Sequence, residues 1–311
     1  MPGARVPAPD LGEPMTQSSA QDARIQALPI WQGSVDISPL HGGLSNESFV
    51  VSDAGQRYVV RFGRDFPFHH VYRDREVMAT RAAHAAGFAP ELVHAEPGVM
   101  VSRFIDGKTY DEADVQDNAE EIARLLRRFH ETMAPHISGP GFIFWVFHVI
   151  RDYAKTLAAG KSRMSDKLPR YLELAEALEK VQAPMPIVYG HHDLLPANFI
   201  HDGSRLWLID FEYAGFGTAM FDLAGVTSNA GFDHDQTEEF LTRYVGRIPD
   251  AALLQSHAAM QCASLLREAM WSMVSELHLN APGVDYVAYT TENLERLGRS
   301  LVAYQTAYGK V

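Results

Sequence analysis

The chain has 311 residues, of which 46% are hydrophobic and 21% are charged, so it can bury a substantial core in one large domain or in two lobes. Its formal net charge of −12 argues against a general nucleic-acid binder, because no basic face is available to neutralise phosphates. ATP is still allowed, since its phosphates need only local donors and a metal. The single cysteine, Cys262, excludes an intrachain disulfide and fits a reducing, cytoplasmic compartment.

Residues 1–20 are rich in proline, glycine and serine and contain no apolar core. We therefore expect a disordered tail there and not a signal peptide. The longest apolar run, Gly141–Phe147, is far too short to cross a bilayer, so no membrane span is expected.

Residues 21–105 are predicted to form a small N-lobe with an antiparallel sheet and one main helix. After a short helix at about 20–28, strands are expected at 35–37, 49–51 and 58–62, and Asp53–Gln56 is a good hairpin turn. A helix is expected at 73–86, where Gly87 ends it, followed by strands at 92–94 and 99–105. This part of the chain is therefore of the α+β class.

After Gly107 the pattern becomes helical. Apolar residues recur at helical spacing in 113–130, and further helices are expected at 142–158, 166–181, 235–245, 251–279 and 284–304. Residues 106–311 are therefore predicted to form a larger, mostly helical C-lobe. A cleft at the boundary near residues 104–108 is the default ligand site.

Four polar residues, His191, Asp193, Asn198 and Asp210, lie within twenty residues on loops between short apolar runs. An ATP-dependent phosphotransferase needs one carboxylate to orient the attacking hydroxyl, and an amide and a second carboxylate to hold the metal. Asp193 and Asn198 taken alone could be plain turn formers. The whole set favours a phosphotransferase, in which His191 is expected to orient the catalytic loop.

This arrangement resembles the choline/ethanolamine kinase family, a branch of the aminoglycoside-phosphotransferase group related to protein kinases. The resemblance extends from about residue 30 to about residue 305 and implies a two-lobed protein-kinase-like fold. It also implies ATP as the phosphoryl donor, Asp193 as the catalytic base, and Mg²⁺ held by Asn198 and Asp210. It is carried by the segments Gly42–Asn46, Val59–Arg61, His191–Asn198, Leu208–Tyr213 and Phe221–Leu223.

A glycine-containing segment near the start of the N-lobe is expected to bind the ATP phosphates. Gly42 and Gly43 would let backbone amides approach phosphate closely, and Ser45 and Asn46 offer side-chain donors. The segment alone could be a plain hairpin turn. Between two strands, it looks like the ATP loop of the family.

Arg61 interrupts an apolar strand and needs an acidic partner. Glu76 on the following helix is the obvious candidate, and Asp74 is left open. The resemblance implies that this pair steadies the phosphates, with arginine in the place where protein kinases have lysine. Phe104 and Ile105 occupy the expected hinge, whose backbone would face adenine.

An acceptor pocket is expected from six C-lobe residues, because a quaternary ammonium is held by aromatic faces and nearby carboxylates. The segment Ala263–Ser272 resembles one that supplies two tryptophans three apart in the family; here the second is Trp271 and the first position is Glu268. This departure makes a primary amine or another amino-alcohol more plausible than choline, and core packing stays open for Trp271. The six residues are Glu212, Tyr213, Glu268, Trp271, Tyr286 and Tyr289.

We therefore expect a small-molecule kinase that transfers the γ-phosphoryl of ATP to the hydroxyl of choline, ethanolamine or a related amino-alcohol. The alternatives are a phosphotransferase for an aminoglycoside or amino sugar, and a catalytically silent nucleotide-binding regulator, against which the intact Asp193, Asn198 and Asp210 speak. His130 is expected to be structural, and Asp222 is expected to brace the catalytic loop through backbone amides. The oligomeric state is left open.

Overall fold

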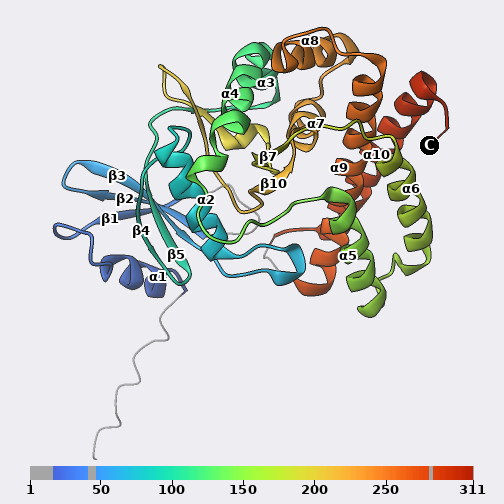
Figure 1. Cartoon of the computed structure of the whole chain (residues 1–311). Coiled ribbons are helices and arrows are strands. Elements are labelled where there is room, and N and C mark those ends of the chain that lie inside the picture. The colour runs from blue at the N-terminus through green and yellow to red at the C-terminus, as the bar shows by residue number, and fades with distance from the viewer. Residues whose placement is uncertain (1–16, 41–46, 280–282, 311) are drawn as a thin grey trace, which may run out of the picture.

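The computed structural model describes residues 17–40, 47–279 and 283–310. Figure 1 shows a sheet at one end of the molecule and a larger body of helices at the other. The predicted fold class, a two-lobed α+β architecture, is confirmed.

The N-lobe is built on a five-stranded antiparallel sheet in the order β1-β2-β3-β5-β4. The predicted hairpin turn joins β2 to β3, where Ala54 and Gly55 both adopt positive φ, as a two-residue hairpin requires. Helix α2 follows the third strand in sequence. The elements are α1 (Gln17–Gln26), β1 (Asp36–Leu40), β2 (Glu47–Asp53), β3 (Gln56–Phe62), α2 (Arg73–Ala85), β4 (Leu92–Glu96) and β5 (Val99–Arg103).

Helix α1 corrects the predicted N-terminal boundary. It begins at Gln17, so residues 17–20 belong to a helix and not to a disordered tail. Ile25 near its end is fully buried and packs with Val51, Val60 and Val101 of the sheet. The tryptophan that follows, Trp31, donates its indole N–H to the carbonyl of residue 25 at 2.6 Å. These tertiary contacts hold a helix that local sequence defines only weakly.

The C-lobe contains eight helices in the described part of the chain, together with short strands that carry the loops of interest. Strands β7 and β10 pair with each other, and β8 lies between β6 and β9. The helices are α3 (Glu112–Asp117), α4 (Ala119–Thr132), α5 (Val146–Ala159), α6 (Leu168–Lys180), α7 (Ala219–Asn229), α8 (His234–Val245), α9 (Ala251–His278) and α10 (Tyr286–Tyr308). The strands are β6 (Lys108–Thr109), β7 (Ile187–Gly190), β8 (Phe199–His201), β9 (Leu206–Leu208) and β10 (Gly215–Thr218).

Two helix predictions in the C-lobe were wrong in detail, and one helix was missed. The helix expected at 113–130 is divided at Asn118, where α3 ends and α4 begins. The helix expected from residue 142 begins at Val146, because Phe144 still donates its amide to the carbonyl of Phe216 in β10. Helix α7 was not predicted, since residues 219–227 are buried on every side and show no amphipathic period.

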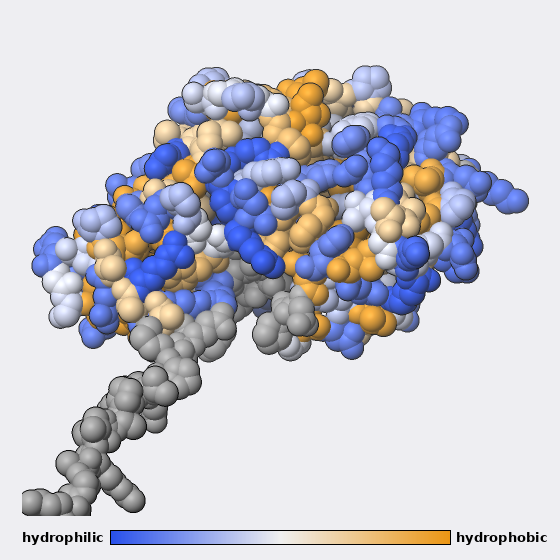
Figure 2. All heavy atoms as spheres, turned by 90° about the horizontal axis from the view of Figure 1, so that it is seen from below, coloured by the Kyte–Doolittle hydropathy of each residue, from blue (hydrophilic) through white to orange (hydrophobic). Residues whose placement is uncertain are grey.

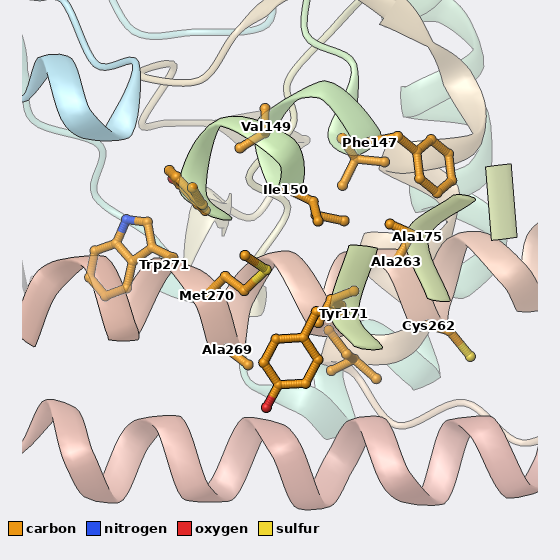
Figure 3. Close-up of a cluster of buried hydrophobic side chains, with 14 of the residues drawn as sticks. Phe147, Val149, Ile150, Tyr171, Ala175, Cys262, Ala263, Ala269, Met270 and Trp271 are labelled. Carbon is orange, nitrogen blue, oxygen red and sulfur yellow. The ribbon is translucent and has the colours of Figure 1, made fainter. Parts of the chain in front are cut away.

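The core of the C-lobe is assembled from α5, α6 and α9. Figure 3 shows Phe147 and Ile150 of α5 packed with Tyr171 of α6 and Met270 of α9. The same cluster of buried side chains includes Phe66, which comes from the segment between β3 and α2 in the N-lobe. The two lobes therefore share a hydrophobic core.

The segment between β3 and α2 is anchored in the C-lobe by a buried histidine. His69, in a 3-10 turn (Pro67–His69), is 2% exposed, and its ring nitrogens lie 3.2 Å from the hydroxyl of Tyr153 and 2.9 Å from that of Ser275. Its ring also stacks on Trp271 with centroids 4.9 Å apart. Since α2 begins only four residues later, at Arg73, the C-lobe fixes where α2 starts.

The molecular surface mixes polar and apolar residues. On the face shown in Figure 2, small hydrophobic patches alternate with hydrophilic side chains. Among the helices of the described residues, none combines the length and the apolar character needed to cross a bilayer.

Candidate active site

The predicted catalytic loop leaves β7 at Gly190, and Asp222, near the start of α7, holds it through hydrogen bonds. The Asp222 carboxylate accepts the amide of His191 at 2.8 Å and the amide of His192 at 2.7 Å. His130 of α4 donates its Nε2–H to the same carboxylate at 2.9 Å. Burial alone would raise the pKa of Asp222, but the hydrogen bond from His130 and the nearby histidines hold that pKa below its usual value. The expected bracing by Asp222 and the structural placement of His130 agree with this geometry.

His192 turns the loop just before Asp193, and sequence reasoning missed it. Its φ of 62° is left-handed, and its ring stacks on Phe144 with centroids 4.4 Å apart. A Cβ at Gly190 or Gly217 would lie 2.5 or 2.9 Å from its Nε2 atom, so both positions must be glycine. Burial lowers the pKa of His192 to about 4, which keeps the ring neutral.

His191 joins the two loops that carry the predicted catalytic residues. Its Nε2 atom lies 2.9 Å from the carbonyl of Ile209, and its Nδ1 atom accepts the amide of Asp193 at 3.3 Å. Burial lowers the pKa of His191 as well. Because both ring nitrogens are engaged, the geometry suits a positioning residue better than a proton carrier.

Asp193 is half-buried at the tip of the catalytic loop. Asn198 donates its side-chain amide to the backbone carbonyl of Asp193 at 2.7 Å, which closes the loop on itself. Burial raises the pKa of Asp193 well above its usual value, the charge of Asp210 adds to this, and Arg267 opposes it. A carboxylate with a raised pKa is suited to accept a proton from an alcohol.

Asp210 follows β9 and faces the N-lobe. Its φ of 67° is left-handed, and its Oδ1 atom accepts a hydrogen bond from Nη1 of Arg61 at 2.8 Å. Arg61, on β3, also forms an ion pair with Glu76 of α2, so Glu76 and not Asp74 is its partner. Although burial raises the pKa of Asp210, the charge and hydrogen bond of Arg61 bring it below the usual value. Asp210 is therefore ionised at neutral pH.

Arg73 makes a second connection between the lobes that sequence reasoning missed. From the first turn of α2, its Nη1 atom donates to Glu76 at 2.5 Å and to Glu212 at 3.0 Å. Burial and the charge of Asp210 raise the pKa of Glu212, and Arg73 counteracts this. Two arginines and three carboxylates thus form one continuous network across the lobe boundary. The spacing of Arg73 and Glu76, three residues apart on a helix, was the available signal.

The predicted acceptor residues fall into two groups. Glu268 and Tyr289 line a pocket together with Asp193. Trp271 is only 7% exposed, stacks on the ring of His69, and donates its indole N–H to the hydroxyl of Tyr213 at 3.0 Å. Figure 3 shows it among the buried side chains of the C-lobe core. Core packing, which the sequence left open, is therefore what the structure shows for Trp271.

The remaining members of the predicted acceptor set are also buried. Tyr286 is 7% exposed and meets Trp271 edge-on with ring centroids 6.2 Å apart. Glu212 is held by Arg73, and Tyr213 lies under the guanidinium of Arg267, whose Cζ atom is 4.5 Å from the ring centroid. None of these predicted acceptor residues lines the pocket beside Asp193.

Of the predicted ATP-binding residues, Gly42, Gly43, Ser45 and Asn46 lie outside the described residues. At the hinge, the ring of Phe104 packs against Arg57 with 4.3 Å between the Cζ atom and the ring centroid. Its amide donates to the carbonyl of Arg57 at 3.0 Å and is not available to a purine.

Ile105 follows Phe104, is partly buried, and lies between β5 and β6. The roles of both hinge residues stay predictions.

Asn198 and Asp210 offer amide and carboxylate oxygens, the ligand types that Mg²⁺ prefers, together with substrate phosphates and water. The carboxylate of Asp210 is paired with the guanidinium of Arg61. The residues therefore fit a magnesium ion.

Comparison with known proteins agrees with this geometry. The model of the phosphotransferase enzyme family matches residues 36–255. A probable ethanolamine kinase of Arabidopsis thaliana is 30% identical over 181 residues, which cover 53% of this chain and 47% of that protein. Protein LicA of Haemophilus influenzae is 25% identical over 224 residues, covering 68% of this chain and 63% of LicA. These matches therefore span about half to just under two thirds of the relatives' length.

A solved structure extends the likeness over almost the whole chain. The choline/ethanolamine kinase family protein from Mesorhizobium loti has a TM-score of 0.74 and 26% identity, with 94% of this chain and 99% of that chain covered. The resemblance inferred from the sequence motifs is confirmed. The family model matches well over half of this chain. Together with the two-lobed fold and the arrangement around Asp193, this match places the chain in the phosphotransferase enzyme family.

Proposed function

We propose that this protein is a kinase that transfers the γ-phosphoryl of ATP to the hydroxyl of a small amino-alcohol, the class that includes choline and ethanolamine. One observation carries the proposal. Asp193, its supporting Asn198, and Asp210 converge at the lobe boundary, where Arg61 reaches Asp210 from the other lobe at 2.8 Å. Kinases of this type need a base, metal ligands and a phosphate-binding cation in one place.

Each residue has a chemical task in this proposal. Asp193 orients the acceptor hydroxyl and takes its proton as the new oxygen–phosphorus bond forms and the bond between the γ-phosphorus and the leaving ADP oxygen breaks. His191 and Asn198 hold the loop so that this carboxylate stays in place. Arg61, steadied by Glu76, presents a guanidinium to the phosphates. When bound at Asn198 and Asp210, Mg²⁺ would neutralise charge on the phosphate oxygens.

The names of the relatives support the acceptor class. A probable ethanolamine kinase and a choline/ethanolamine kinase family protein are among the proteins that this chain matches.

The burial of Cys262 raises the pKa of its thiol to about 11, so it is an unreactive core residue. We infer a reducing, cytoplasmic compartment from this cysteine usage.

The proposal is tested by magnesium-dependent ADP release with a panel of acceptors. Choline, ethanolamine, amino sugars and aminoglycosides are assayed with the full chain and ATP. Acceptor-dependent ADP release with an amino-alcohol supports the proposed kinase. Release only with aminoglycosides or amino sugars would assign the alternative phosphotransferase activity, and the absence of any acceptor-dependent release would leave a nucleotide-binding regulator.

A further inference from the structure

The pocket beside Asp193 is where the acceptor must lie if Asp193 is the base. It is lined by the loop that carries Asp193 and by three helices, α7, α9 and α10. Its ionisable lining includes two arginines, Arg267 of α9 and Arg296 of α10, which no motif predicted. The chemistry of these side chains bears on which alcohol can bind.

The acidic groups of this pocket are already engaged. Glu268 accepts the hydroxyl of Tyr289 at 2.8 Å through one oxygen and Nη1 of Arg267 at 2.8 Å through the other. Asp222 is occupied by backbone amides and His130. Asp193 is reserved for the acceptor hydroxyl. A cationic head group would therefore find no free carboxylate of its own among the described lining residues.

Arg296 is a cation held only by neutral oxygens. Its Nη1 atom donates to the side chain of Asn293 at 3.2 Å, and its Nη2 atom lies 3.2 Å from the carbonyl of Ser228 and 3.4 Å from Asn229. No carboxylate of residues 17–40, 47–279 or 283–310 forms an ion pair with it. Asn229 in turn donates to the carbonyl of Leu194 at 3.3 Å, which links Arg296 to the residue after Asp193.

Arg267, which lines the same pocket, carries an unpaired edge. It is 4% exposed, and neither Nε nor Nη2 has a hydrogen-bond partner in the part of the chain that the structure describes. Nε and Nη2 form one side of the guanidinium, with the spacing that suits two oxygens of a carboxylate or phosphate. Buried donors of this kind favour a ligand that supplies acceptors.

The ring faces of Tyr213 and Trp271, two of the residues expected to hold a quaternary ammonium, are occupied. The guanidinium of Arg267 covers the ring of Tyr213, with 4.5 Å between its Cζ atom and the ring centroid. The ring of Trp271 is stacked on His69. Cation–π recognition of a ligand requires an open face. An ammonium group in this pocket would instead approach two guanidinium groups.

We propose that the acceptor alcohol also carries an oxyanion, a carboxylate or a phosphate ester, and that Arg296 and Arg267 bind it while the hydroxyl faces Asp193. The inference rests on the proposed kinase function and narrows its substrate class. A zwitterionic amino-alcohol would place its carboxylate on these arginines and its amine away from them. Arg296 is then a specificity-determining residue, and Arg267 supplies two buried donors, Nε and Nη2.

The test compares matched acceptors with one another, in assays that contain the full chain and magnesium ATP. Choline, ethanolamine and glycerol are assayed beside L-serine, glycerate and glycerol 3-phosphate, and the two oxyanion types separate a carboxylate from a phosphate ester. We expect the highest kcat/KM with an oxyanion-bearing alcohol. Arg296→Gln should raise the KM for that acceptor by about 10- to 100-fold, the value of a hydrogen bond to a charged group, with a smaller change in kcat.

Two further variants separate recognition of the acceptor by Arg296 from a purely structural role, in which Arg296 would only hold the end of α7. Arg296→Lys keeps the charge and should retain part of the preference for oxyanion acceptors. Arg299→Gln removes the same charge from an exposed position three residues further along α10, outside the pocket lining, and should leave the ratio of kcat/KM values unchanged. A drop in Tm without a change in that ratio in Arg296→Gln would overturn the proposal.

The outcomes also distinguish the inference from the function on which it rests. If choline or ethanolamine is the best acceptor and Arg296→Gln does not alter the ranking, the kinase stands and the inference is overturned. If no alcohol stimulates magnesium-dependent ADP release, the proposed kinase function itself is contradicted.

Discussion

Arg61 and Asp210 join the two lobes directly: Nη1 of Arg61, on a strand of the N-lobe sheet, donates to Oδ1 of Asp210 in the C-lobe at 2.8 Å. The same guanidinium pairs with Glu76 of α2. A cation on the sheet is thus held by one carboxylate from its own lobe and one from the other. This arrangement places a proposed phosphate-binding group next to a proposed metal ligand.

Replacement of Arg61 should weaken ATP binding. Arg61→Ala removes the guanidinium but leaves Glu76 paired with Arg73, so the protein should still fold. We expect the KM for ATP to rise by about 10- to 100-fold, as for the loss of a charge-assisted hydrogen bond, and Arg61→Lys to show a smaller rise. Arg64→Ala, an exposed arginine just beyond the same strand, is the control. An unchanged KM for ATP in Arg61→Ala would remove Arg61 from the nucleotide site.

Replacement of Arg73 should destabilise the protein more than it affects ATP binding. Arg73→Met leaves Glu212 buried without its cation, and breaking a buried ion pair in this way costs about 3 kcal/mol. Combining it with Glu212→Gln should recover part of the loss, since the uncompensated charge is then gone. Urea unfolding measures both, with Arg81→Met on the exposed side of α2 as the control. Equal stability of Arg73→Met and the control would show that the Arg73–Glu212 pair contributes nothing.

Stability should fall between pH 6.5 and pH 4. Burial lowers the pKa of His192 and of His257 to about 4, whereas an unfolded histidine has a pKa of about 6.5. The unfolded state therefore binds more protons in this window, and the stabilisation present above pH 6.5 is lost as the pH falls toward 4. Each histidine contributes on the order of 3 kcal/mol to this loss over the whole window.

The variant His257→Gln isolates one of these titrations away from the active site. His257 lies 3.0 Å from the hydroxyl of Thr227, a contact that glutamine can replace. The free energy of unfolding, measured from pH 7.5 to pH 4, should decline less steeply in the variant than in the wild-type protein. Identical slopes would mean that His257 does not titrate as its burial implies.

Much of this site was predictable because it is encoded locally. Asp193 and Asn198 share one loop, and the Asp53–Gln56 turn sets the β2–β3 hairpin. The partnership of Arg61 with Glu76 was also within reach, since a charge on an apolar strand requires a partner nearby.

Contacts between distant segments could not be read from the sequence in the same way. Arg73 reaches Glu212 across 139 residues, and Arg267 covers a ring that belongs to Tyr213. Trp271 was expected to line an acceptor pocket because of the motif spacing, but it stacks on His69, which belongs to the segment between β3 and α2 of the other lobe. Only the fold brings these pairs together. The role of Arg267 and Arg296 in the pocket had no local pattern at all.

Asp193→Asn tests the assignment of Asp193 as the base most directly, because it preserves the size of the side chain and removes the carboxylate. The measurements are magnesium-dependent ADP release with the best acceptor of the panel and nucleotide affinity by calorimetry, with the exposed Asp235→Asn as the control. We predict that kcat falls by about 10²- to 10⁴-fold while ATP binding is retained. Turnover close to that of the wild-type protein in Asp193→Asn would contradict the assignment of Asp193 as the catalytic base.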